Sequence, residues 1–218
     1  MLVRDCMSKK VITIDEDTPI IKAFRIMKDN NVRRLLVVKN GDIIGIVTDK
    51  DLKEATPSKA TSLDVHEIYS LLSEVKVKDI MSKDLYTIGP DESIEKAAMM
   101  MLKRKISGLP VVEGGKLVGV ITQTDIFRAL VDISGLTRGG VKIAVELPDI
   151  PGTAQEVINT IRTHGGRIVS VMTSYNADKE GHRHLFVRTD IEEKKLSELL
   201  EAIAKRFKVL YAIKDVMV

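Results

Sequence analysis

The motif Gly-x-x-Thr-x-x-Asp occurs twice in the chain, at residues 45–51 and 119–125. In each copy a strand-like apolar pattern ends at a threonine, Thr48 or Thr122, where we expect a helix to begin. The N–H groups at the start of a helix favour a phosphate or another anion. One turn later, the carboxylate of Asp51 or Asp125 can accept two hydrogen bonds from a ribose diol. The motif is therefore a candidate for binding a phosphate and a ribose.

The same spacing also has a purely structural interpretation. A threonine followed three residues later by an acid is a capping box, which only closes the first turn of a helix. The glycine at the head of each motif, Gly45 or Gly119, admits the close approach of either a ligand or another backbone segment. The occurrence of the motif in both copies does not distinguish a binding site from a cap, because a duplication copies either one. The sequence leaves both interpretations open.

The motif belongs to a longer internal repeat. Residues 3–52 align with residues 77–126 at an offset of 74 without a gap, and 19 of the 50 aligned positions are identical. Such self-similarity predicts two copies of one structural unit. We expect each copy to hold a short strand, a helix, a β-hairpin and a second helix that begins at the threonine of the motif.

Turn and capping residues mark where the elements of the first copy begin and end. Asp17-Thr18-Pro19 predicts a helix start, with a capping residue before proline at the first helical position. Asn40-Gly41 predicts a hairpin turn in which both residues have positive φ, and Gly114-Gly115 takes this place in the second copy. The amphipathic segment Leu63–Val75 predicts a linking helix. Strands are expected at Val11–Ile14, Leu35–Val38 and Ile43–Val47.

A different pattern follows the repeats. Three glycines between Ser134 and Gly140 predict a linker. Beyond it the elements follow the ferredoxin-like order βαββαβ. The first of these helices is expected to open with a capping box from Thr153 to Glu156. The expected strands are Val141–Leu147, Ile168–Tyr175, His184–Thr189 and Val209–Val216, and the second helix is Ile191–Ala204.

The repeat resembles the cystathionine-β-synthase (CBS) domain over roughly residues 1–130. The resemblance rests on Val-x-Asp-x-Met-Ser at residues 3–8 and 77–82, a Leu-x-Val-Val strand, the Gly-x-x-Thr-x-x-Asp ending and Ser107–Val112. It implies that the copies pair into a Bateman module, which binds an adenosyl ligand (AMP, ADP, ATP or S-adenosylmethionine) in two clefts. By position, one cleft takes Thr18, Ala23, Arg33, Thr122, Thr124 and Asp125, and the other takes Thr48, Lys50, Asp51, Ala97, Ile106, Ser107 and Pro110.

The two implied clefts differ in charge. Arg33-Arg34 supplies two guanidinium groups where the second copy has Ser107-Gly108. Because guanidinium pairs bidentately with phosphate, we expect the cleft with Asp125 to prefer a phosphorylated nucleotide. The alternative is that both arginines are solvated surface charges. Glu92, which replaces Thr18 in the second copy, disfavours a polyphosphate in the other cleft.

Residues 140–218 resemble an ACT domain through the loop at residues 147–152, Leu-Pro-Asp-Ile-Pro-Gly, between the first strand and the first helix. The resemblance implies that two such domains pair and that an amino acid can bind at this loop. Gly152 and the N–H groups of Thr153 and Ala154 suit a carboxylate, and Asp149 completes the candidate set. The alternative is a plain turn with a structural or dimerising role.

Composition argues against several classes of protein. The net charge of +3 with interleaved signs, 4% aromatics and absence of Trp argue against a nucleic-acid partner. One cysteine excludes an intrachain disulfide and suits a reducing cytosol. No apolar run approaches the roughly 20 residues of a membrane span, and the charges within Met1–Asp5 predict no signal peptide. His182 and His184 have the spacing of two metal ligands, but solvated hairpin residues are the favoured interpretation and no metal is expected.

The sequence thus predicts an α/β (α+β) fold with CBS units at 1–62 and 77–133, a linking helix at 63–76, a linker at 134–140 and an ACT domain at 141–218. We identify no nucleophile–base pair or carboxylate dyad in it. We therefore expect a cytoplasmic, non-enzymatic sensor without a cofactor, for which an adenosyl nucleotide is the regulatory ligand. A second copy of the chain and a regulated enzyme are the expected partners. The alternative is an amino-acid-sensing or structural dimerisation subunit, which acts through the ACT domain with empty CBS clefts.

Overall fold

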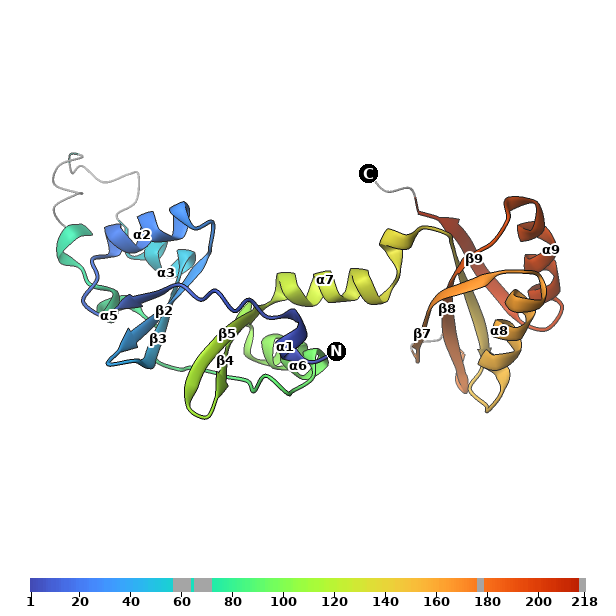
Figure 1. Ribbon diagram of the computed structural model, residues 1–218, viewed down its shortest axis with the longest axis horizontal. Coiled ribbons are helices and arrows are strands. Elements are labelled where there is room, and N and C mark those ends of the chain that lie inside the picture. The colour runs from blue at the N-terminus through green and yellow to red at the C-terminus, as the bar shows by residue number, and fades with distance from the viewer. Residues whose placement is uncertain (57–63, 65–71, 176–178, 216–218) are drawn as a thin grey trace. The chain divides into compact units, whose positions relative to one another are not determined.

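The computed structural model describes residues 1–56, 64, 72–175 and 179–215. The chain divides into two compact units, Met1–Ile126 and Phe127–Val218. Both sequence repeats lie in the first unit, and the strands from β6 (Val141–Pro148) onward lie in the second (Figure 1). The division falls within one helix, α7 (Gln123–Ile133), whereas the sequence predicts the boundary after residue 133.

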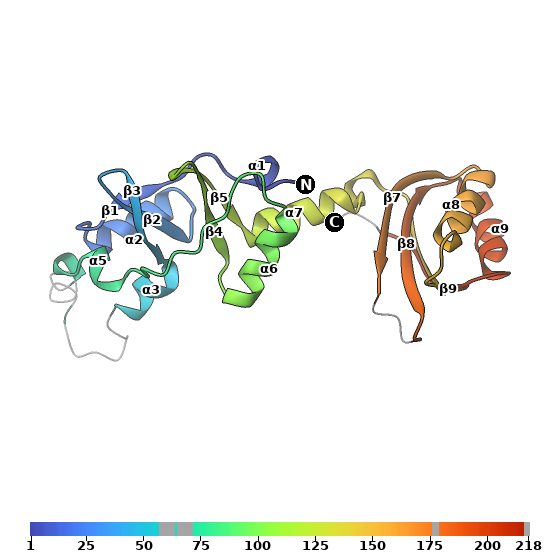
Figure 2. The same cartoon turned by 90° about the horizontal axis from the view of Figure 1, so that it is seen from below.

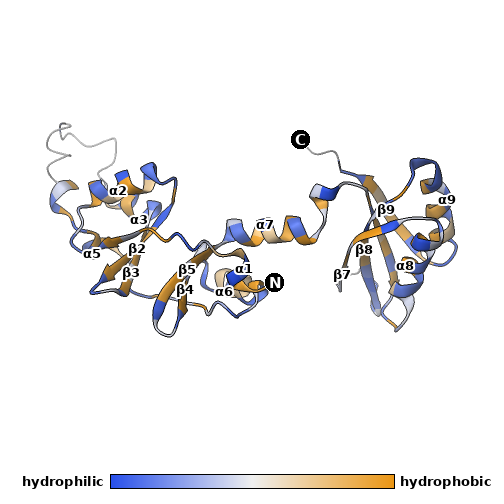
Figure 3. Ribbon diagram, in the orientation of Figure 1, coloured by the Kyte–Doolittle hydropathy of each residue, from blue (hydrophilic) through white to orange (hydrophobic). Residues whose placement is uncertain are grey.

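The first repeat forms a three-stranded sheet in the order β1-β2-β3, with β1 parallel to β2 and β2 antiparallel to β3. The predicted hairpin turn is confirmed, because Asn40 and Gly41 both have positive φ, at 52° and 92°. Apolar side chains of the sheet and helices form one buried core, and Figure 3 shows these strands as predominantly hydrophobic. Its elements are β1 (Thr13–Asp15), α2 (Ile20–Asp29), β2 (Arg34–Lys39), β3 (Asp42–Thr48) and α3 (Asp49–Glu54).

The second repeat follows the same order with a smaller sheet. Gly114 and Gly115 form its hairpin turn with positive φ, as predicted. Within residues 77–126, all of which are described, the counterpart of β1 is reduced to one parallel bridge between Ile88 and Val111. The named elements are α6 (Ile94–Arg104), β4 (Gly108–Glu113), β5 (Lys116–Thr122) and α7.

The opening segment of each sequence repeat packs on the other repeat. Helix α1 (Val3–Cys6) opens the chain, yet it contacts α6 and β5 of the second repeat. The N–H of Val3 donates to the carbonyl oxygen of Glu92 at 2.8 Å, and Ser8 pairs with Val120 in an isolated bridge. Residues 1–8 therefore belong to the second repeat in packing, although residues 3–8 open the first repeat in sequence.

The reciprocal contact involves helix α5 (Val77–Ile80), which lies against β3 of the first repeat. The N–H of Val77 donates to the carbonyl oxygen of Thr18 at 2.9 Å, and the buried Val77 side chain belongs to the core of the first repeat. Ser82 pairs with Ile46 in an isolated bridge. Each packed half of this unit therefore combines most of one sequence repeat with the opening segment of the other.

The motif glycines lie where these exchanged segments cross the hairpins. A side chain at Gly45 would meet the sulfur and backbone of residues 81–82, and one at Gly119 would meet Met7 and the carbonyl oxygen of Ser8. The sequence allowed either a ligand or another backbone segment to come close to these glycines. In the structure a second backbone segment comes close to both of them.

The predicted start of α2 is displaced by one residue. Pro19, with φ −60° and ψ 142°, is the N-cap itself, and Ile20 is the first helical residue, so Thr18 does not cap the helix. Proline is accommodated because its carbonyl accepts the bonds from Lys22 and Ala23 while its missing N–H is not needed there. The predicted linking helix at 63–76 lies mostly outside the described residues. In the described part of this range, Leu72–Glu74 are helical.

The second unit has the predicted βαββαβ order. Its antiparallel sheet has the strand order β7-β8-β6-β9, which is the ferredoxin-like arrangement. Helices α8 and α9 cover one face of this sheet in both views (Figures 1 and 2) and enclose its apolar core. The elements are β6 (Val141–Pro148), α8 (Thr153–Thr163), β7 (Arg167–Ser174), β8 (His182–Asp190), α9 (Glu193–Ala204) and β9 (Lys208–Lys214).

The segment predicted as a linker is packed against this sheet. It contains a short 3-10 helix, η1 (Leu136–Arg138), and its glycines have positive φ. The side chain of Arg188 on β8 is only 3% exposed and donates to the carbonyl oxygens of Ser134 at 3.1 Å and Gly139 at 3.5 Å. Its remaining nitrogen reaches the carboxylate of Asp215 at 2.5 Å. A buried arginine thus holds residues 134–139 in place.

Candidate functional site

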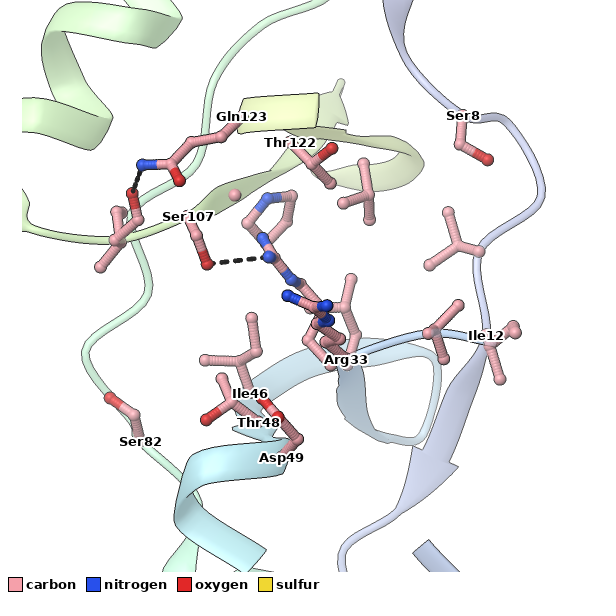
Figure 4. Close-up of a pocket in the computed structure, with 18 of the residues that line it drawn as sticks. Ser8, Ile12, Arg33, Ile46, Thr48, Asp49, Ser82, Ser107, Thr122 and Gln123 are labelled. Carbon is pink, nitrogen blue, oxygen red and sulfur yellow. Dashed lines mark hydrogen bonds between the residues drawn. The ribbon is translucent and has the colours of Figure 1, made fainter. Parts of the chain in front are cut away.

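A cavity of about 840 Å³ lies between the two repeats of the first unit. Both motifs contribute to its walls, and Figure 4 shows Thr48 and Thr122 on opposite sides of it. Sites for small organic ligands have volumes of roughly 300–1,000 Å³. The resemblance implies two clefts, and residues assigned to both of them line this cavity.

Each motif forms a complete capping box at the wall of this cavity. The N–H and hydroxyl of Thr48 both donate to Oδ2 of Asp51, at 2.7 Å each, and the N–H of Asp51 donates to the threonine oxygen at 3.3 Å. Thr122 and Asp125 repeat this pattern at 2.9, 2.6 and 3.4 Å. The structural interpretation of the motif is therefore confirmed in both copies. A carboxylate has two oxygens and about four acceptor positions, so this role is compatible with a ligand contact.

Arg34 extends from the first repeat to the second across the cavity. Its Nη2 donates to the hydroxyl of Ser107 at 2.8 Å, the bond that Figure 4 marks beside Ser107. Burial lowers the pKa of the Arg34 guanidinium, whereas the nearby carboxylates of Asp125 and Asp49 raise it. Arg33 also lines the cavity but is exposed, and its carbonyl oxygen accepts a bond from the N–H of Asp49. The two arginines therefore have unequal roles.

The cavity brings together most of the residues that the CBS resemblance implies. Asp125 is not among the lining residues, although Thr122, to which it is hydrogen-bonded, lines the cavity. Ala23 and Ala97 are 0% exposed on the inner faces of α2 and α6, and Thr18 is outside the lining, so these three residues are not brought to the cavity. The implied residues that line it are Arg33, Arg34, Thr48, Lys50, Asp51, Ile106, Ser107, Pro110, Thr122 and Thr124.

Some lining residues were missed in the sequence. Asn31 and Lys105, at equivalent positions of the repeat, both have left-handed backbones, with φ of 52° and 54°. Tyr86 also lines the cavity, and its ring lies 4.4 Å from the guanidinium carbon of Arg104. Its repeat counterpart is Ile12, which lines the cavity too. Comparing equivalent positions of the two copies is the signal that could have found these residues.

The candidate amino-acid loop of the second unit is organised by its own side chains. Gly152, with φ 93°, is the N-cap of α8, so the predicted capping box at Thr153 is wrong. The Thr153 hydroxyl instead donates to the carbonyl oxygens of Pro148 and Ile150, at 3.0 Å each. Asp149 lies 3.4 Å from the guanidinium of Arg183, and Ala154 packs against the core. These contacts are those of a turn held by its own side chains.

The remaining candidates have ordinary surroundings. Nε2 of His184 lies 3.7 Å from a carboxylate oxygen of Glu146, and Nδ1 of His182 lies 3.2 Å from the carbonyl oxygen of Glu180. Within the described part of the chain, no three His, Cys, Asp or Glu side chains gather as a metal site. None of the helices there is both long and apolar enough to cross a membrane.

Known proteins share the repeat region. The CBS domain family matches residues 3–58 and 77–132, just over half of the chain. A CBS domain-containing protein of Dictyostelium discoideum is 34% identical over 135 residues, which cover 61% of this chain and 93% of that protein. An uncharacterized protein of Methanocaldococcus jannaschii is 31% identical over 207 residues, which cover 87% of this chain. The chain spans about half, 48%, of the length of that second relative.

Solved structures are similar to about 60% of the chain. The CBS domain pair of protein MJ0100, in complex with 5′-methylthioadenosine and S-adenosyl-L-methionine, is 30% identical with a TM-score of 0.50 and covers 60% of this chain and 95% of its own. CBSX2 in complex with AMP is 26% identical, with a TM-score of 0.51 and coverage of 61% and 97%. A Vibrio cholerae protein named for acetoin utilization (AcuB) is 27% identical, with a TM-score of 0.52 and coverage of 63% and 96%. Two family matches in tandem and a shared fold lead to one conclusion: this chain belongs to the CBS-domain family and contains a CBS pair, or Bateman module.

Proposed function

We propose that the chain is a non-enzymatic regulatory sensor, which binds an adenosyl ligand between its CBS repeats and transmits the bound state to a partner. The observation that carries this proposal is the cavity of about 840 Å³, which is lined by Thr48 and Asp51 of one motif and by Thr122 of the other. The ligands of the similar CBS pairs, AMP in one and methylthioadenosine with S-adenosylmethionine in the other, support the adenosyl class.

In this proposal the motif residues act on the sugar and the 5′ group. Asp51 and Asp125 accept hydrogen bonds from ribose hydroxyls through carboxylates that the capping boxes hold in place. The side chains of Arg33, Arg34 and Lys50 supply positive charge for a 5′ substituent. The apolar lining, including Ile106 and Pro110, provides contact area for the adenine.

Sensing requires that the ligand bind two states of the protein with different affinity. The exchanged segments support this idea, because each repeat supplies part of the packing of the other. A ligand that contacts both repeats thereby acts on one connected structure. The partner in this scheme is a regulated enzyme, which receives the changed conformation.

The ferredoxin-like unit is proposed to be an ACT domain, and the chain to be a homodimer. The topology of the second unit and the Asp149–Gly152 loop support the first idea. Exposed apolar residues on α7 support the second: Phe127, Leu130 and Val131 are 64%, 56% and 39% exposed at helical spacing along one stripe. A dimer through this face would bury them.

Calorimetric titration of the purified chain with AMP, ADP, ATP and S-adenosylmethionine tests the sensor. We expect saturable binding of at least one of them, and mass spectrometry of molecules released from the protein as purified should detect an adenosyl compound. If a folded protein binds none of the four, the proposal is overturned. If an amino acid binds instead and Asp125→Ala leaves this binding unchanged, the amino-acid-sensing alternative replaces it.

A further inference from the structure

The two repeats differ most clearly at one pair of equivalent positions facing the cavity. Arg34 opens β2 and pairs with Thr48 across the hairpin, and Gly108 opens β4 and pairs with Thr122 in the same way. The same backbone position beside each capping box therefore carries a guanidinium in one repeat and no side chain in the other.

The guanidinium of Arg34 lies against Gly108, the residue at the equivalent position of the second repeat. A side chain at Gly108 would overlap Nη1 of Arg34, so the arginine occupies the space that the glycine leaves open. Ser107, the neighbour of this glycine, accepts the bond from Nη2 at 2.8 Å. The second repeat thus fixes the orientation of the planar group, and one fixed bond leaves donors on the other nitrogens of the fork.

The lining of the cavity carries more positive than negative side chains, while the carboxylates nearest to Arg34 are those of Asp125 and Asp49. The described residues that line the cavity include five cationic side chains (Lys10, Arg33, Arg34, Lys50 and Lys105) and three anionic ones (Asp49, Asp51 and Asp84). Arg34 is partly withdrawn from water, and charges interact more strongly where water is partly excluded. Arg33 remains exposed, so solvent screens its charge more completely.

We infer that Arg34 is the specificity-determining residue of the cavity, which selects adenosyl ligands with an anionic group on the 5′ carbon over those with a neutral 5′ hydroxyl or thioether. The inference rests on the proposed function. It assigns the discrimination between nucleotides and neutral nucleosides to one side chain, which the second repeat holds by Ser107 and accommodates by Gly108. AMP fits this description, and adenosine and 5′-methylthioadenosine do not.

The test is calorimetric titration of the full chain with AMP, adenosine and 5′-methylthioadenosine. Wild type should bind AMP at least about tenfold more tightly than either neutral ligand, as expected for charge-assisted bonds. Arg34→Ala should weaken AMP binding by about tenfold to 100-fold and leave the affinity for adenosine within about twofold. Arg34→Lys should recover only part of the difference, because an ammonium lacks the bidentate fork.

Three further variants make the result specific. Arg33→Ala should weaken AMP binding by less than Arg34→Ala does. Arg25→Ala, which removes an exposed arginine of α2 outside the cavity, should change nothing. Gly108→Ala retains Arg34 but fills its place, and it should lower the preference for AMP over adenosine even if Arg34→Ala does not fold.

The possible failures are distinguishable. If wild type binds none of the three ligands, the inference is overturned, and the proposed function falls with it when ADP, ATP and S-adenosylmethionine also fail to bind. If wild type binds AMP and adenosine equally, or if Arg34→Ala lowers both affinities by the same factor, the inference alone is overturned and the adenosyl site stands.

Discussion

The sulfur of Met81 lies against the α-carbon of Gly45, 2.5 Å from the position that a Cβ on this glycine would take. The carbonyl oxygen of Ser82 is also close, at 3.1 Å from that position. The glycine therefore has a packing role, since it admits the opening segment of the second repeat at residues 81–82.

Substitution of this glycine should destabilise the first unit. We expect Gly45→Ala to lower the free energy of unfolding by about 1–3 kcal/mol, because the added methyl group overpacks the crossing and the backbone of Ser82 cannot yield as a side chain can. Urea denaturation measures the change. Gly89→Ala is the matched control, since its Cβ would meet only Cγ of Glu92 at 3.6 Å. Equal stability of the two variants would contradict the packing role.

The capping boxes allow stability and binding to be separated. Thr48→Ser keeps a hydroxyl at the N-cap of α3 and should retain both stability and ligand affinity. Asp51→Ala removes the acceptor of two bonds and should cost about 0.5–2 kcal/mol of stability. If Asp51 also holds a ribose, the affinity for AMP per folded molecule should fall as well. Unchanged affinity in the folded variant would restrict Asp51 to its capping role.

The contact between Asp17 and Lys78 should make docking of the exchanged segment depend on pH. Their 2.6 Å hydrogen bond, followed by the charge of Lys78, lowers the pKa of Asp17 from its ordinary value of 3.8. A lowered folded-state pKa means that the stabilisation is complete above the ordinary value and is lost as the pH falls through the lowered one. The same pair raises the pKa of Lys78 above its ordinary value of 10.5, so that its contribution is complete below that value and is lost only at higher pH.

Thermal unfolding of wild type and Asp17→Asn at several pH values measures this contribution. Because both side chains are largely exposed, we expect a small difference at pH 7 that disappears in strong acid and in about 1 M salt. A difference that persists in strong acid would have to arise from something other than this ion pair.

Arg188 should be essential to the second unit. Arg188→Ala removes the donor to the Gly139 carbonyl oxygen and to the carboxylate of Asp215. It also leaves the carbonyl oxygen of Ser134 with the Ser170 hydroxyl alone. We expect the change to cost about 3–5 kcal/mol, mainly because the Asp215 carboxylate loses its cation. Asp215→Asn should cost less, because that side chain is 31% exposed. Hydrogen exchange in residues 134–140 should accelerate in Arg188→Ala, and slow exchange there would show that other contacts hold the segment.

The apolar face of α7 offers a test of the proposed homodimer. Leu130→Glu places a charge in the exposed stripe and should convert a dimer to a monomer in light scattering after size-exclusion chromatography. Asp132→Asn, at an exposed polar position of the same helix, should leave the mass unchanged. A wild-type chain that is monomeric at micromolar concentration would contradict the dimer.

Local rules predicted much of this architecture. The turn at Asn40-Gly41 and the threonine start of α3 follow from backbone preferences within a few residues. The start of α8 shows their limit, because Thr153 uses its hydroxyl for the preceding loop and Gly152 takes the capping position. The segment at 134–140 appeared to be a linker because its anchor, Arg188, lies about fifty residues further along the chain.

The candidate site was predictable in its motifs and not in its contacts. The repeat identifies the motif residues, because the same pattern occurs twice, at Thr48 and Asp51 and at Thr122 and Asp125. The bond between Arg34 and Ser107 joins residues 73 positions apart, and the repeat alone does not say which arginine reaches across. Similarly, residues 3–8 and 77–82 carry the same pattern, so the sequence cannot tell on which copy each segment packs.

The exchange of segments sets an order for synthesis of the chain. When a ribosome has released residues 1–62, the first repeat still lacks Val77 and its neighbours, and residues 1–8 have no surface to bind. The first core can close only after α5 has left the exit tunnel. The N-terminal residues can pack only after β5 has been synthesised, because α1 contacts this strand. A fragment cut at the border of the sequence repeat is therefore incomplete, whereas one that spans residues 9–82 contains both the first repeat and the segment that packs on it.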